Sequence, residues 1–336
     1  MAGLMQESLA SSSQDPQGPE AGPDREIAGR SPMKIAFDRL RRDKVAIVCF
    51  VIVIFFVLIA VFAGVIADLF GVSTESVRAS DRIDLATGLP LDGPPNNGFD
   101  PEHPFGVAPK SGNDLLAYWL FGCRTSLIIA SVATIVSTVI GVVLGLVAGY
   151  AGGIWDRVIQ FITDIFLTLP FLLAALAIAP ILSERFGDNP DLYIALRYYF
   201  VIIILSVFGW MQISRIVRGE VLSLREREFV LAARVMGVPT RRILFKEILP
   251  NLVSPIVVSI SLGLPAFVAF EAVMAYLGIG VSGRPSWGQT IQAATPYFDI
   301  YPLYLWEPVI GIILLVVALN LLGDAIRDAV DPKTRR

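Results

Sequence analysis

Residues 223–251 read SLREREFVLAARVMGVPTRRILFKEILPN, a charged, helix-favouring segment that lies between two long apolar runs. Ser223 and Glu226 have the spacing of a capping box, in which each side chain satisfies a free backbone N–H of the other residue where a helix begins. Gly237 favours the left-handed conformation that ends a helix, and Pro239 prevents the helix from continuing. The sequence therefore predicts a short helix over residues 224–236.

The two faces of this predicted helix differ in character. One face carries apolar side chains at helical spacing: Phe229, Ala232, Ala233 and Met236. The other face is basic, with Arg225, Arg227 and Arg234. Because alanines let the backbone of another protein come close, the pattern favours docking to a partner. An ordinary amphipathic helix that lies on a bilayer surface is the alternative.

The rest of the chain contains uncharged runs that are long enough to cross a membrane. Apolar residues make up 54% of the 336 residues and the mean hydropathy is +0.66, and one crossing needs about 20 apolar residues. Six runs qualify or nearly qualify: Val45–Ala67, Thr125–Gly153, Ile165–Ser183, Tyr198–Ser214, Asn251–Phe270 and Pro308–Gly323. The last is a few residues short, and it can extend back through Trp306 and Glu307. The sequence predicts an all-α integral membrane protein with six transmembrane helices.

The basic residues are distributed unequally between the two sides of these spans. If the spans alternate in direction, one side carries 18 Lys and Arg residues and the other carries 7. The first side comprises residues 31–44, 154–157, 215–250 and 324–336, and the second comprises residues 68–124, 184–197 and 284–307. The positive-inside rule then places both termini and the 215–250 loop in the cytoplasm.

Composition divides the chain into segments. Residues 1–30 are rich in Ser, Pro, Gly and Gln and are predicted to be disordered. Residues 31–44 are predicted to form an interfacial cytoplasmic helix before the first span, residues 45–67. Residues 68–124 form an extracytoplasmic loop, 125–323 a core domain with the other five spans, and 324–336 a cytoplasmic tail.

Several kinds of chemistry lack their residues in this chain. There is no Gly-x4-Gly-Lys-Ser/Thr sequence that could hold ATP phosphates, and the one histidine, His103, lies in the polar loop. Cys49 and Cys123 are expected near opposite sides of the membrane, so neither a disulfide nor a His/Cys metal site is predicted. We expect no catalytic residue, no bound cofactor or metal, and no nucleic-acid partner.

A few positions inside the spans stand out. Gly141, Gly145 and Gly149 recur every fourth residue, which favours close helix packing in lipid over lipid-facing flexibility. Pro170 is expected to kink the third span, as are Pro180, Pro255 and Pro265 in their spans. Asp164 is predicted to lie well inside the bilayer, either as a functional ionisable group or as part of a structural pair or cap. Glu271 is expected at the outer boundary, as a gate or interface residue or simply hydrated.

Residues 232–250 resemble the cytoplasmic docking loop of ABC importer permeases, the EAA loop. Its core reads Glu-Ala-Ala, three residues, Gly, nine residues, Ile-x-Leu-Pro, and the matching positions here are Ala232, Ala233, Gly237, Leu249 and Pro250. Two positions depart from it, because Leu231 stands at the family Glu and Glu247 at the family Ile. Glu228 keeps acidic character one turn earlier.

Further segments are similar to the "C" type permeases of the dipeptide, oligopeptide and nickel importer group. They are HPFG (103–106), GCRTSLIIA (122–130), TDIFLTLP (163–170), AYLGIGVSGRPSWGQTI (275–291) and LLGDAIRDAVDPKTRR (321–336). Together with the docking loop, the similar segments span residues 103–336.

The resemblance implies a type I ABC importer permease fold in the bacterial cytoplasmic (inner) membrane, in contact with membrane lipid. It implies a second permease subunit of the B type, two ATPase subunits that use ATP and Mg, and an extracytoplasmic peptide-binding protein. The implied ATPase-coupling residues are Ser223, Glu226, Glu228, Phe229, Ala232, Ala233, Arg234, Met236, Gly237, Leu249 and Pro250. Asp164, Pro170 and Glu271 are candidate bundle or gate positions.

The resemblance favours import of di- or oligopeptides, and few His, Cys or clustered carboxylates occur along the spans to support nickel. Nickel or another small solute remains an alternative cargo. A secondary transporter that works without ATPases and a non-transporting membrane scaffold are the alternatives from other classes.

Overall fold

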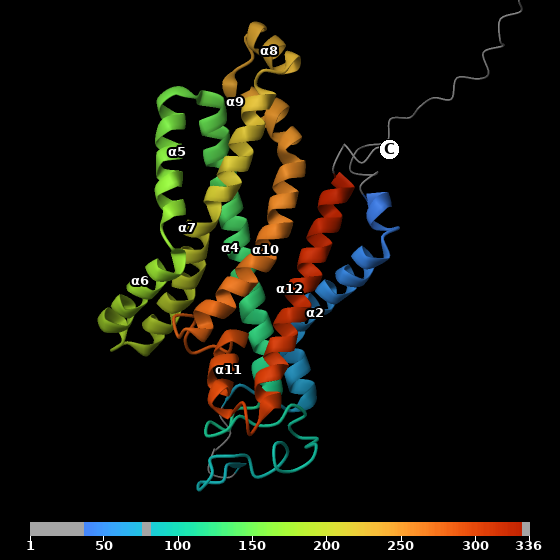
Figure 1. Cartoon of the computed structure of the whole chain (residues 1–336), viewed down its shortest axis with the longest axis vertical. Helices are drawn as coiled ribbons and strands as arrows, with labels where there is room; N and C mark the ends of the chain where they lie inside the picture. The colour runs from blue at the N-terminus through green and yellow to red at the C-terminus, as the bar shows by residue number, and fades with distance from the viewer. Residues whose placement is uncertain (1–36, 76–81, 331–336) are drawn as a thin grey trace, which may run out of the picture.

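A computed structural model describes residues 37–75 and 82–330, and within them the chain is helical, with two isolated β-bridges and no β-strand. Figure 1 shows a bundle of long helices, with a short helix beyond one end and, at the other, a long loop that includes residues 82–114. The predicted disordered tail (1–30), residues 31–36 of the predicted interfacial helix and the last six residues lie outside the described residues.

Each predicted span overlaps a long helix or, for the third span, a pair of helices. Their bounds are α2 Lys44–Phe70, α4 Leu115–Ala151, α5 Gly153–Thr168, α6 Phe171–Phe186, α7 Pro190–Leu224, α8 Glu228–Val235, α9 Thr240–Arg242, α10 Val253–Tyr276, α11 Trp287–Ala294 and α12 Pro302–Val330. Five helical stretches are each long and apolar enough to cross a membrane, and the pair α5 and α6 forms a sixth crossing if it is counted as one broken span. The all-α membrane fold is therefore confirmed in the described residues.

The row of glycines on α4 packs against α7. A Cβ atom on Gly145 would lie 2.7 Å from Val217 Cβ and 2.8 Å from the Ser214 carbonyl oxygen. Added Cβ atoms at Gly141 and Gly149 would also approach α7 atoms to 2.7 Å. The two backbones are therefore so close that only glycine fits at these three positions. The interpretation of close helix packing is confirmed.

The third predicted span is broken. The two helices α5 and α6 meet at Leu169 and Pro170 with a bend of 80°, which is far more than the predicted kink. Pro170 lacks an N–H and disfavours a helical conformation at the residue before it, so α5 ends there and α6 begins anew. The first backbone bond of α6 runs from the Ala174 N–H to the Pro170 carbonyl, at 3.1 Å.

Two helices extend beyond the membrane spans predicted for them. The helix that holds the second span begins at Leu115, ten residues before Thr125, because the Asp114 side chain accepts the Ala117 N–H at 2.7 Å. At the other end of the chain, α12 begins at Pro302 and ends at Val330. It therefore includes Trp306 and Glu307, through which the short last span was expected to extend. Residues 324–330 are therefore helical, and their assignment to a cytoplasmic tail stays a prediction.

An aromatic cluster near the long loop ties four helices together. Trp119 of α4 and Trp287 of α11 lie 5.7 Å apart between ring centroids, and each packs against Phe56 of α2. Trp287 Nε1–H donates to the Trp119 carbonyl at 3.0 Å, and Trp119 Nε1–H donates to the Glu307 carbonyl of α12 at 3.1 Å. These bonds satisfy the indole N–H groups of buried Trp287 and half-buried Trp119 in an apolar setting.

The contact between α4 and α7 predicts that Gly145→Ala is destabilising. The new methyl group would overlap Val217, and relief of such overpacking costs about 1–3 kcal/mol. We expect a lower midpoint of thermal unfolding for the variant, measured by fluorescence-detected size-exclusion chromatography in detergent.

Gly64→Ala is the matched control, since Gly64 lies in α2 with no atom within 4 Å of an added Cβ. This variant should unfold at the wild-type temperature or slightly above it. Equal midpoints for the two variants would contradict close packing at Gly145.

Candidate functional site: the loop between α7 and α10

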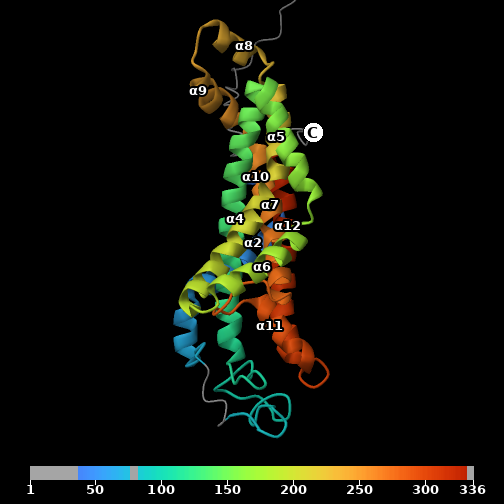
Figure 2. The ribbon, with the colours of Figure 1, turned by 90° about the vertical axis from the view of Figure 1, so that its left-hand side faces the viewer.

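The loop between α7 and α10, residues 225–252, lies at one end of the bundle, opposite the long loop. Figures 1 and 2 both show α8 projecting past the ends of α4, α5 and α7. This position leaves α8 accessible to another molecule.

The start of α8 differs from the prediction. Ser223 is not a helix cap, because α7 continues through it to Leu224, and α8 begins only at Glu228, after Arg227. Buried Val217 and Val221 hold the last turns of α7 against α4, so tertiary packing extends α7 past the local capping signal. The predicted capping box of Ser223 and Glu226 is therefore wrong.

The end of α8 agrees with the prediction. Gly237 has a φ of +72°, and its N–H donates to the Arg234 carbonyl at 3.0 Å. The Val238 N–H donates to the Ala233 carbonyl at 3.0 Å. This double closure is a Schellman motif, which requires a left-handed residue at the position of Gly237.

The predicted apolar stripe of α8 divides between two faces. Ala233 and Val230 are buried, and they join an apolar cluster formed by Leu146 of α4, Val217 of α7 and the start of α10. Phe229 and Met236 instead point outward and are 42% and 73% exposed, and Ala232 is exposed with them. One face of α8 thus anchors it to the bundle, while the other offers apolar surface. Val230 was missed, because the stripe was assigned from Phe229.

Two arginines fix this loop to the end of α4. The Arg234 guanidinium lies over the Tyr150 ring, 4.9 Å from its centroid. Arg225 Nη1–H donates to the Gly149 carbonyl at 3.0 Å, and its Nε–H donates to Glu226 at 3.1 Å. These contacts would therefore transmit a displacement of α8 directly to α4.

Leu249 and Pro250 lie in an irregular turn that leads into α10. Residues Ile243–Ile248 form a π-helical turn and Leu249–Leu252 a 3₁₀ turn. Pro250 has no N–H to donate to the carbonyl four residues earlier, which accounts for the loss of regular helix here. Leu249 packs against the same apolar cluster as Val230.

Two ion pairs join α5 to α7. Of their four residues, only Asp164 was among the predicted site residues. Arg218 Nε–H and Nη2–H donate to the two carboxylate oxygens of Asp156 at 2.5 and 2.7 Å, a bidentate arrangement. Asp164 accepts from Arg215 at 2.5 Å, with side chains that are 60% and 48% exposed. The structure thus places Asp164 in an ion pair, and any role in gating stays a prediction.

Glu271 does not lie in a hydrated boundary. It is fully buried, with 0% exposure, where α10 meets α4 and α11. The carboxylate faces the hydroxyls of Ser126 and Ser286, but neither of its oxygens makes a hydrogen bond of good geometry with a described residue. Hydration was therefore the wrong interpretation, because the apolar helices around this position close over it.

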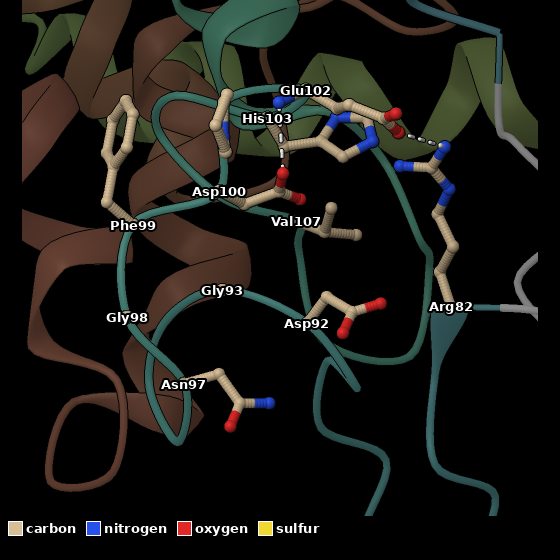
Figure 3. Close-up of a pocket in the computed structure, with 11 residues that line it drawn as sticks. Arg82, Asp92, Gly93, Asn97, Gly98, Phe99, Asp100, Glu102, His103 and Val107 are labelled. Carbon is tan, nitrogen blue, oxygen red and sulfur yellow. Dashed lines mark hydrogen bonds and ion pairs between the residues drawn. The ribbon is translucent and has the colours of Figure 1, made fainter.

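The long loop holds its own pocket at the other end of the molecule. A cavity of about 910 Å³ is bordered by Asp92, Asp100 and Glu102, and Figure 3 shows Glu102 reaching toward Arg82, 3.7 Å away. His103, which the sequence placed in a polar loop, is buried with Nδ1 against the Asp114 carboxylate.

The long loop is also fastened to the segment before α12. The Tyr301 hydroxyl donates to the Phe105 carbonyl at 3.1 Å, and burial raises the pKa of Tyr301. The phenol therefore keeps its proton and stays a donor over the physiological pH range.

Residues 141–336, more than half of the chain, match the family described as binding-protein-dependent transport system inner membrane component. The chain belongs to this family. Residues 31–76 match the N-terminal TM domain of oligopeptide transport permease C. The protein is therefore a permease subunit of the ABC importer class, of the C type.

Curated relatives match along nearly the whole permease. The oligopeptide transport system permease protein OppC of Bacillus subtilis is 31% identical over 96% of this chain and 97% of its own length. The dipeptide transport system permease protein DppC of Alkalihalophilus pseudofirmus is 33% identical over 93% and 94%. OppC of Escherichia coli K12 is 32% identical over 92% and 94%.

A chain of a solved structure that shows inward-facing conformations of the MetNI methionine ABC transporter is also similar to the permease. The TM-score is 0.49 at 23% sequence identity, over 64% of this chain and 96% of that chain.

The bidentate pair predicts a measurable link between α5 and α7 of the permease. Arg218→Gln should lower the free energy of unfolding by about 1.5–3 kcal/mol, the range for hydrogen bonds to charged groups. The double variant D156R/R218D should recover part of this loss, and thermal unfolding of the purified protein checks both.

Arg82→Gln is the control, because its 3.7 Å pair with the exposed Glu102 lies in the loop outside the membrane spans and is worth about 0–1 kcal/mol. Equal destabilisation by the two single substitutions would show that burial and bidentate geometry do not distinguish the two pairs.

Proposed function

We propose that this permease is one of two membrane subunits of an ATP-driven importer that carries di- or oligopeptides across the bacterial cytoplasmic membrane. Its relatives over nearly the full length are named for oligopeptide and dipeptide transport. The observation that carries the coupling role is the divided surface of α8, which is anchored by Val230 and Ala233 and exposes Phe229 and Met236.

The orientation follows from charge. The α8 end of the bundle carries the loops that are rich in Lys and Arg, so the positive-inside rule assigns it to the cytoplasm together with both termini. The long loop, whose cavity is bordered by acidic residues, then faces the extracytoplasmic side. This is the side on which a binding protein would deliver cargo.

Partner subunits supply what the chain lacks. A B-type permease would complete the pathway, and two ATPase subunits would bind ATP and Mg, for which this sequence has no phosphate-binding loop. An extracytoplasmic binding protein would select the peptide. In this arrangement α8 seats in a groove of one ATPase, and closure of the ATPase pair on ATP moves α8 and shifts the bundle between inward- and outward-open states.

The contacts of α8 suit the transmission of a rigid displacement. Arg234 over Tyr150 and Arg225 on the Gly149 carbonyl connect the loop to α4, and the glycine row connects α4 to α7. Motion of α8 would thus move two packed helices together rather than bend a loose loop.

Peptide is preferred over nickel as the cargo. A nickel pathway would need soft or imidazole ligands, but the one histidine lies in the long loop, and Cys49 and Cys123 are separate, buried thiols. Nickel or another small solute is the second candidate, because the related importer group includes such systems.

The cap of α8 yields one prediction for coupling. Gly237→Pro removes the N–H that Gly237 donates to Arg234 and forbids a φ of +72°. We expect normal membrane insertion but loss of ATP-driven peptide uptake in proteoliposomes that contain the complete transporter.

The control is Gly219→Ala, at an exposed position of α7 where an added Cβ meets no atom within 4 Å. It should retain wild-type uptake. Normal uptake by the Gly237→Pro variant would refute the coupling role of this cap.

The exposed face of α8 yields a second prediction. Affinity purification of the wild-type permease from its native membrane in mild detergent should recover a second permease and ATPase subunits, identified by mass spectrometry. The double variant F229D/M236D should recover at least about tenfold less ATPase, because two charges enter an apolar interface.

Leu85→Asp is the control, since it adds a charge at a leucine of the long loop that is 87% exposed, more than Phe229 or Met236. It should leave ATPase recovery unchanged. Recovery of the wild-type chain alone or as a homo-oligomer, without an ATPase, would instead support an ATP-independent secondary transporter.

A further inference from the structure

Arg197, near the start of α7, is a buried guanidinium without a carboxylate partner. It is 5% exposed and makes no ion pair with any residue in the described part of the chain. Its Nη2–H donates to the Gly278 carbonyl at 2.6 Å, whereas its Nε–H is buried and has no acceptor. The other contact is the Tyr193 ring, 5.8 Å from the guanidinium carbon.

These contacts leave Arg197 electrostatically incomplete. A guanidinium has five N–H donors, and one hydrogen bond to a described residue is made here. Taking such a charge out of water costs several kcal/mol unless an opposite charge and further hydrogen bonds compensate. An aromatic ring and one carbonyl compensate only part of that cost. An oxyanion would supply both the opposite charge and the acceptor that Nε–H lacks.

The guanidinium borders a cavity of about 590 Å³, open toward the surface, between α6, α7 and the turn after α10. This size is within the range of about 300–1,000 Å³ that is typical of small-ligand sites. The Ser183 and Tyr193 hydroxyls, 2.9 Å apart, lie in the wall, and so does the exposed carboxylate of Glu184. The cavity therefore offers a cation, an anion and hydroxyl groups to one ligand.

We propose that this cavity is a subsite for the transported peptide, in which Arg197 binds the terminal carboxylate and Glu184 binds the terminal ammonium group. The proposal rests on the proposed function as a peptide importer. A free guanidinium edge fits a carboxylate in the bidentate manner that arginine favours.

The location suits a site of entry. The cavity lies near the connection between α6 and α7, at the end of the bundle away from α8 (Figures 1 and 2). With the long loop on the extracytoplasmic side, this is the end at which cargo arrives. The cavity also joins α6, the half-span beyond the 80° break, to α7 and the end of α10.

A phospholipid headgroup has similar charges but fits the cavity less well. The apolar residues in the wall are Ala179, Pro180 and Ile279, too few to hold an acyl chain. A groove between α2 and α12 has the opposite character, because its wall is apolar apart from Lys44. A short zwitterionic peptide therefore matches the cavity better than a lipid.

The test compares a peptide that has a free C-terminus with the same peptide amidated. Initial uptake of each is measured in proteoliposomes with the complete transporter and saturating binding protein. The ratio of the two rates is then compared between permease variants, so the preference of the binding protein cancels. Arg197→Gln should lower the free-to-amidated ratio about tenfold, whereas Arg185→Gln, at an exposed position of α6, should leave it unchanged.

A second variant covers the case in which Arg197→Gln does not accumulate. Glu184→Gln lies at an exposed position, and it should lower the ratio of uptake between the free and the N-acetylated peptide. A fall in that ratio supports the subsite, and an unchanged ratio overturns it.

The remaining outcomes are also decisive. An equal loss of uptake for the free and amidated peptides in Arg197→Gln would mean that Arg197 only ties α7 to Gly278. Loss of a co-purified phospholipid in that variant, with an unchanged ratio, would assign the cavity to lipid. Either result overturns the inference alone, whereas a wild-type transporter that carries neither peptide overturns the proposed function as well.

Discussion

The close contact between α4 and α7 is the constraint on which the rest of the structure depends. Lipid supplies no hydrophobic force between helices, so their association relies on tight packing and polar contacts. Three glycines remove the side chains that would separate the two backbones. The same contact places Arg218 beside α5 and Val221 beside the anchoring cluster of α8. The positions of both the broken span and the loop helix therefore follow from it.

Prolines set the other main constraint, because each one removes a backbone donor. In hydrocarbon an unsatisfied backbone group is costly, so irregular backbone is tolerated only where protein or water surrounds it. Pro170 ends one half-span and starts another, and Pro250 coincides with the π and 3₁₀ turns before α10. The chain bends by 80° at Pro170, whereas the helical path from Thr240 to Tyr276 continues through Pro250. The break at Pro170 is therefore the place at which two rigid half-spans can move relative to one another.

Local patterns predicted the helices well, and tertiary contacts explain the errors. The spans, the glycine row and the left-handed Gly237 are properties of a few neighbouring residues, and all appear in the described structure. The start of α8 was wrong because packing against α4, which no local pattern reveals, extends α7 beyond Ser223. Glu271 was misplaced for the same reason, since its burial depends on two other helices. The Asp156–Arg218 pair joins residues 62 positions apart, a separation at which sequence spacing carries no information.

The arginines of α7 show how one helix can serve two ends of the molecule. Near α8, Arg215 and Arg218 are both neutralised by carboxylates of α5. Near the other end, Arg197 is buried and lacks such a partner, although Glu184 borders the same cavity. The two exposed or half-buried arginines have counter-ions. Arg197, whose charge costs more because it is buried, has none among the described residues. A ligand that supplied this counter-ion would bind α6 and α7 together, and α7 is the helix whose far end packs against the anchor of α8.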